Sequence, residues 1–156
     1  MLRKRRVRRT RAGTYKLELP AEERTLLRTL LPQLRQLLEA PPDDPRVRRL
    51  YPTAFADDPE KEAEYQRFMR EELVASRAAA IDAVESTLDA RELDEGQAMA
   101  WMSAVNSVRL VLGTLLDVSE ELDIDGLPDD DPDIQSYALY AYLSMLLEEL
   151  VQAAGR

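Results

Sequence analysis

Neither proline nor glycine occurs between Glu60 and Glu95, and this uninterrupted stretch constrains the fold more than any other feature of the sequence. Asp58-Pro59-Glu60 precedes it, and an aspartate followed by proline and an acidic residue is a typical helix start. A helix that runs to about Leu88 would be roughly 45 Å long. Its apolar residues are sparse and separated by alanines, so we expect it to be half exposed.

Three further helices are predicted from apolar residues at helical spacing. The first follows Pro20 and carries a leucine face from Leu26 to Leu38, with a kink or a short break expected at Pro32 because proline clashes with the preceding turn. The second begins with a capping box, formed by Asp94 and Gln97, and is apolar nearly all round, as central core helices are. The last begins at Asp131-Pro132.

The N-terminal region predicts a small β-hairpin. Val7 and the alternating segment 15–19 flank a turn at residues 11–14. We therefore expect a mainly α fold, a compact bundle of about four helices with a short N-terminal β-hairpin. The 156 residues fit a single domain, with a basic arm at 1–11 and a helical body at 12–154.

The chain contains no cysteine and no histidine. This excludes disulfides, thiolate nucleophiles, Cys/His zinc sites and Ser-His or Cys-His catalytic pairs. The acidic segment 121–132 begins like an EF-hand loop, but its twelfth position is Pro132 rather than glutamate, so a solvated connection is favoured over a calcium site. We expect a protein without enzymatic activity, metal or cofactor. Because neither a signal peptide nor a membrane span is evident, we also expect it to remain in the cytoplasm.

Basic residues crowd the first eleven positions, although the whole chain carries a net charge of -9. Without them, 14 basic residues face 30 acidic ones, which leaves residues 12–156 with a charge of -16. Two interpretations are open: the arm binds the phosphate backbone of nucleic acid, or it covers the hairpin edge and offsets the acidic body. The candidate nucleic-acid-binding residues are Arg3, Lys4, Arg5, Arg6, Arg8, Arg9 and Arg11.

Three residues of the last two helices are candidates for contact with a protein partner. Arg109 lies on the flank of an apolar helix face, where a guanidinium needs either an internal carboxylate or a polar interface. Tyr137 and Tyr140 belong to a tyrosine row, with Tyr142, that fits either the core or an interface. The apolar excess of these two helices also favours a homodimer.

Several segments together resemble one family. They are YKLELP before the first helix, LYPTAFADDPEKEAEYQRFMREEL, and WMSAVNSVRLVLGTLLDV, in which RLVLGT is the most specific run. In this order they resemble the actinomycete oxidative-stress transcriptional regulator (AosR) family, formerly an actinobacterial domain of unknown function. The resemblance implies a DNA-associated transcriptional regulator that contacts a sigma factor or RNA polymerase. It implies no catalytic residues.

The genomic setting of that family offers a second class of function. Members are typically encoded near a Clp protease adaptor and sulfur-metabolism genes. By this association, the alternative is a protein–protein interaction module or adaptor of Clp proteolysis that does not bind DNA.

Overall fold

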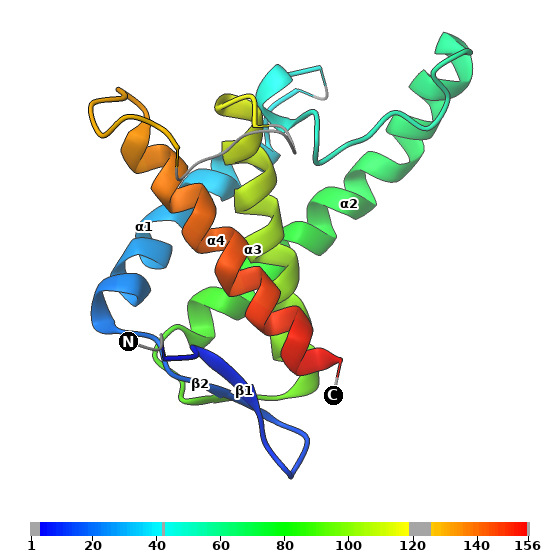
Figure 1. Cartoon of the computed structure of the whole chain (residues 1–156). Coiled ribbons are helices and arrows are strands. Elements are labelled where there is room, and N and C mark those ends of the chain that lie inside the picture. Colours follow the sequence, from blue (N-terminus) through cyan, green and yellow to red (C-terminus); the bar gives the residue numbers. More distant parts are fainter. Residues whose placement is uncertain (1–3, 42, 119–125, 156) are drawn as a thin grey trace.

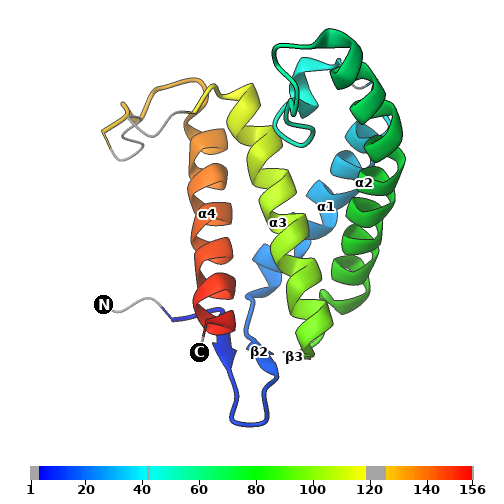
Figure 2. The same cartoon turned by 90° about the vertical axis from the view of Figure 1, so that its right-hand side faces the viewer.

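Four helices pack into a bundle, and a small antiparallel sheet closes one of its ends (Figures 1 and 2). The computed structural model describes residues 4–41, 43–118 and 126–155. Both described ends of the chain lie at the sheet end, whereas the α1–α2 and α3–α4 connections lie at the other. The predicted mainly α fold with an N-terminal hairpin is confirmed. The helices are α1 (Ala21–Leu38), α2 (Pro59–Thr87), α3 (Glu95–Leu115) and α4 (Ile134–Ala154).

The long helix predicted from the proline- and glycine-free stretch is α2. The Asp58 side chain caps it by accepting a hydrogen bond from the Lys61 backbone N–H at 3.1 Å. Its buried residues all lie in the second half, between Ala80 and Thr87. The first half projects away from the bundle (Figure 1), so the expected half exposure is confirmed.

Helix α1 buries the predicted leucine face, through Leu27, Leu31, Leu34 and Leu38. It continues through Pro32, so of the kink or short break expected there, the break is wrong. Pro32 is exposed, and the Arg28 carbonyl that loses its helical partner can be hydrated on that side.

Helix α3 is the central helix, packed against both α2 and α4. The predicted capping box is present: Gln97 N–H donates to Asp94 Oδ1 at 2.8 Å, and Asp94 N–H donates to Gln97 Oε1 at 2.9 Å. Trp101 is fully buried, and its indole N–H donates to the Thr87 hydroxyl at 2.8 Å. Among the described residues, α3 alone is long and apolar enough to cross a membrane, and half of that apolar window is buried inside the bundle.

The sheet has the order β1-β2-β3. Strands β1 (Val7–Arg9) and β2 (Tyr15–Leu17) form the predicted hairpin, in register Val7 with Leu17, and Gly13 adopts the positive φ of 87° that its turn requires. Strand β3 (Glu92–Leu93) was not predicted. A strand of two residues is too short to show an alternation of apolar and polar residues in the sequence. Only the tertiary packing places it beside β2.

Candidate functional site

The basic N-terminal segment is built into the sheet and held by a buried carboxylate. Glu149 of α4 is only 4% exposed, and its Oε1 accepts the backbone N–H of Arg6 at 2.7 Å and that of Val7 at 3.4 Å. Val7 itself is buried in the core. The start of β1 is therefore fastened to α4 through its backbone, which leaves the side chains around it in defined positions.

The Arg6 side chain turns inward to α1. Its Nε and Nη2 donate to the two carboxylate oxygens of Glu23, at 3.1 and 2.8 Å. Burial opposes the charged form of Glu23, but the interactions with Arg6 and Tyr142 together outweigh that cost and hold the Glu23 pKa below its usual value. Tyr142 lies beside this pair, and burial, followed by the neighbouring Glu23 carboxylate, raises its pKa. Arg6 thus links the sheet to α1.

Because of this ion pair, we expect the stability of the protein to depend on pH. Because the Glu23 pKa is lower in the folded chain than in the unfolded one, its contribution is complete above the ordinary value of 4.5 and is lost as the pH falls through the folded value. We expect Glu23→Gln to lower the melting temperature at neutral pH. The gap from the parent should close between about pH 5 and pH 3. The exposed neighbour Glu22 provides the control, and an equal gap at all pH values would contradict the prediction.

Arg9 is also turned toward the body. Its guanidinium lies 5.2 Å from the centre of the Tyr15 ring, and Nη1 donates to the Ala154 carbonyl at 3.3 Å. Nη2 lies 3.5 Å from Glu95 of α3. The alternation of β1 explains this position, because Arg9 is two residues from the buried Val7 and shares its face.

The remaining cations around the hairpin point toward solvent. Arg8 and Lys16 are direct cross-strand partners, an arrangement of like charges that destabilises a sheet unless something bridges it. Glu18 provides the bridge: its carboxylate lies 3.1 Å from Arg8, 3.3 Å from Lys16 and 3.3 Å from Lys4. Hydrogen bonds from Lys16 and then Lys4 lower the Glu18 pKa. One carboxylate is therefore shared by three cations.

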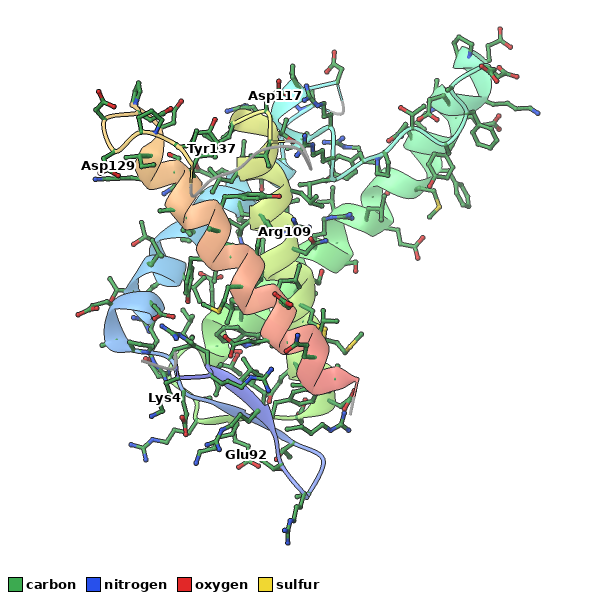
Figure 3. All side chains as sticks on the ribbon, viewed as in Figure 1. Lys4, Glu92, Arg109, Asp117, Asp129 and Tyr137 are labelled. Carbon is green, nitrogen blue, oxygen red and sulfur yellow. The ribbon has the colours of Figure 1, made fainter. Side chains whose placement is uncertain are left out.

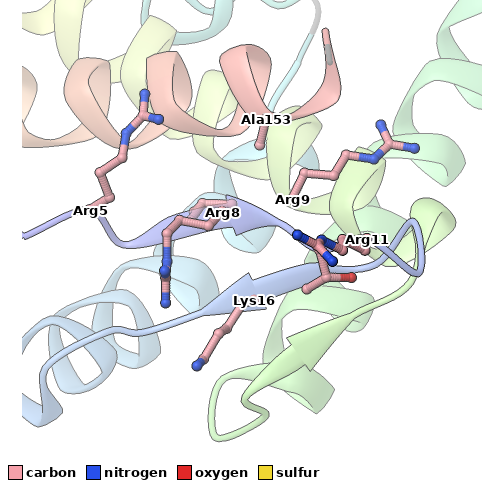
Figure 4. A pocket seen from close by; sticks show the side chains of 8 residues that line it. Arg5, Arg8, Arg9, Arg11, Lys16 and Ala153 are labelled. Carbon is pink, nitrogen blue, oxygen red and sulfur yellow. The ribbon is translucent and has the colours of Figure 1, made fainter.

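We call the outward cations the hairpin patch: Lys4, Arg5, Arg8, Arg11 and Lys16. Together with Arg9 and Ala153, most of them line a hollow of about 390 Å³ along β1 (Figure 4). Arg8 and Lys16 extend to the same side of the hairpin, whereas Arg5 extends toward α4 and donates a hydrogen bond to Gln152. In the described part of the chain, neither Arg5 nor Arg11 has an ion pair with a carboxylate.

The structure thus divides the seven cations singled out in the sequence. Arg6 and Arg9 hold the sheet, Lys4, Arg8 and Arg11 are exposed, and Arg5 is half-buried beside Gln152 of α4, while Arg3 lies outside the described residues. Lys16 was missed, since it stands beyond the basic cluster in sequence; its place opposite Arg8 follows from the hairpin register. Of the calcium-like segment, Glu121, Asp123 and Asp125 also lie outside the described residues.

Arg109 and Tyr140 lie together where α3 and α4 meet, and Tyr137 lies nearer the far end of the bundle (Figure 3). Arg109 donates to the Tyr140 hydroxyl and to the Asn106 side-chain oxygen, both at 3.0 Å. Within the described ranges no carboxylate pairs with it, so the internal ion pair considered for Arg109 is wrong. Tyr137 approaches the Leu116 carbonyl at 3.5 Å.

Gly113 of the RLVLGT run faces a crowded junction at the end away from the sheet. A Cβ there would lie 2.8 Å from Arg49 Nη1 and 3.0 Å from the Tyr140 ring. Arg49 in turn donates to the Val118 carbonyl at 3.1 Å. The absence of a side chain at Gly113 leaves room for both neighbours, and Arg49 is a contact that the sequence did not indicate.

Comparison with known proteins gives one family and a set of curated relatives. The domain of unknown function DUF2017 matches residues 4–154. The oxidative stress regulator AosR of Mycobacterium tuberculosis H37Rv is 32% identical over 127 residues, 70% of this chain and 58% of that protein. An AosR protein of Mycobacterium leprae is 30% identical over 129 residues, 72% of this chain and 59% of its own.

The chain therefore spans less than three fifths of the length of these relatives. Their names describe regulators and not enzymes. No solved structure matches the chain.

Proposed function

This chain belongs to the DUF2017 family and is similar to AosR oxidative stress regulators, and from that premise we propose that it is a non-enzymatic transcriptional regulator that binds the DNA backbone through its hairpin patch. In this proposal the helical body contacts a sigma factor or RNA polymerase. The projecting half of α2, which carries Phe68 at 80% exposure, is the part of the body available for that contact.

The observation that carries the proposal is that three cations share the carboxylate of Glu18. Lys4, Arg8 and Lys16 all form ion pairs with this single carboxylate, so their positive charge is only partly offset. Arg5 and Arg11 add two further cations to the same hollow. A cluster of guanidinium and ammonium groups with few acidic neighbours favours phosphate, which arginine can grip with its planar fork.

The form of the patch favours backbone contact over base reading. Its cations come from strands of three residues and their turn, and because β1 packs on α4 and β2 pairs with β3, the hairpin is not a free β-ribbon of the kind that enters the major groove. Phosphate contacts fix a protein on the duplex but carry no sequence information. Sequence selection would then come from the protein partner.

The alternative, an interaction module or adaptor associated with Clp proteolysis, is favoured by a different observation. Arg6 and Arg9 are already held by Glu23 and Glu95, and their charge serves the fold. If the outer cations act in the same way, the patch only offsets the acidic body, and the exposed α2 segment is the functional surface.

Neutralising Glu18 distinguishes the two functions. Glu18→Gln frees three cations without removing any, so we expect affinity for duplex DNA to rise about three- to tenfold at moderate salt. Fluorescence anisotropy with a labelled duplex measures it. Glu22→Gln, which changes the net charge equally on the nearby α1, should leave the affinity almost unchanged. Absence of DNA binding by both the parent and Glu18→Gln at low salt would overturn the DNA proposal and favour the adaptor.

A further inference from the structure

A second hollow lies between α3 and α4, and Gln152 at its edge accepts a hydrogen bond from Arg5 of the hairpin patch. Its volume is about 490 Å³, and it is lined by Arg109, Ser144, Leu147, Glu148, Val151 and Gln152. Two of its polar atoms, Arg109 Nε and Ser144 Oγ, are shielded from solvent and make no hydrogen bond within the described chain. Buried polar atoms are usually satisfied, so this face is incomplete as it stands.

The hollow holds a cation and an anion that do not pair with each other. Arg109 bonds only to the neutral groups of Tyr140 and Asn106. Glu148 is exposed and accepts a hydrogen bond only from the Gln152 side chain, at 3.3 Å. Neither takes part in an ion pair among the residues that the structure describes. Among these residues, Arg109 therefore lacks an anionic partner and Glu148 lacks a cationic one.

Their positions along the helices explain why they stay apart. Arg109 bonds to Tyr140, which precedes Glu148 by two turns of α4, about 12 Å along the axis. Leu147 and Val151 lie on the same face, and Val151 is 53% exposed. The face thus has a cation toward one end, an anion toward the other and apolar side chains among them.

We propose that this face binds a second copy of the chain in a two-fold symmetric dimer. In such a contact, a pairing between two positions occurs twice, once in each direction. Arg109 would meet Glu148 of the partner subunit, and Glu148 would meet Arg109 of the partner subunit. Because the two charges lie at different heights, this pairing needs the two α4 helices to run antiparallel.

The antiparallel arrangement has a consequence for the rest of the molecule. Since the sheet closes one end of each bundle, the two hairpin patches face opposite ends of the dimer. The inference does not depend on DNA binding, because its partner is a second copy of the chain and its charge pairs are made by Arg109 and Glu148, which are not part of the hairpin patch.

Charge exchange tests the dimer. Sedimentation velocity over a concentration series measures the dissociation constant of the parent, of Glu148→Arg, of Arg109→Glu and of the double variant. Each single change places like charges across the interface and should weaken the dimer at least about tenfold, whereas the double variant should regain most of the lost affinity. Glu72→Arg, an exposed change on α2, is the matched control.

A separate substitution covers the case in which Arg109→Glu disturbs the fold. Val151→Asp alters an exposed side chain of the same face and should also produce monomers, with an unchanged circular dichroism spectrum. A parent that is monomeric at all concentrations would overturn the inference. So would a dimer that Glu148→Arg and Val151→Asp leave intact, or single-variant losses that the double variant does not repair.

Discussion

Replacing Arg8, Arg11 and Lys16 together with glutamine should weaken binding to duplex DNA by about five-hundredfold at about 0.1 M salt. These three side chains line the hollow along β1, and they are exposed. Each phosphate contact releases about 0.9 of a condensed counterion, so three contacts account for nearly three decades in affinity at that salt. Fluorescence anisotropy or filter binding measures the change.

The control for this variant removes the same charge elsewhere. Lys61, Arg48 and Arg67 are exposed and lie away from the sheet, so their triple replacement by glutamine should affect binding far less. Both triple variants should fold, because none of the six side chains is buried. Equal losses of affinity in the two variants would mean that DNA binding depends only on the net charge of the protein and that the patch has no special role.

Replacing Glu149 with leucine should destabilise the protein by about 2–4 kcal/mol. The carboxylate accepts the backbone N–H groups of Arg6 and Val7, and leucine of similar size leaves a part-buried and a buried donor without this acceptor. Denaturant titration measures the free energy of unfolding. Hydrogen exchange should show the largest loss of protection in β1 and β2, where the anchor acts.

Glu149→Gln separates the hydrogen bonds from the charge. Its amide oxygen can still accept from Arg6 and Val7, so the expected loss is about 1 kcal/mol. If the glutamine and leucine variants lose equal stability, the backbone hydrogen bonds are not the source of the effect. An unchanged hydrogen exchange pattern in the sheet would contradict the anchoring role.

The helices could be predicted from the sequence because their signals are local. Asp58-Pro59 begins α2, the Asp94 and Gln97 pair begins α3, and both caps form with the expected partners. At Pro32 the break that proline can cause did not occur, since the exposed side of α1 tolerates the missing hydrogen bond. Strand β3 has no local signal, because it exists only through its pairing with β2.

The candidate site was predictable in composition but not in arrangement. Seven cations in eleven residues indicated a basic surface, yet the separation of Arg6 from Arg8 depends on Glu23 and Glu149, which lie far along the chain. The central place of Glu18 follows from three side chains meeting in space. Likewise, only the packed structure shows that Arg109 has neutral partners.

In the proposed regulator, a response to oxidative stress cannot run through a thiol within these residues, because the chain has no cysteine. A redox signal would have to reach it through a partner or another group. This fits a regulator that contributes contacts to DNA and protein while the sensing chemistry takes place elsewhere.

The slope of log affinity against log salt concentration, compared between the parent and the Arg8, Arg11 and Lys16 triple variant, tests the central claim most directly. If all five cations of the hairpin patch contact phosphates, the parent slope should approach about -4.5 and the variant slope about -2. The two slopes would be equal if the patch does not contact DNA, and that result would contradict the proposed function.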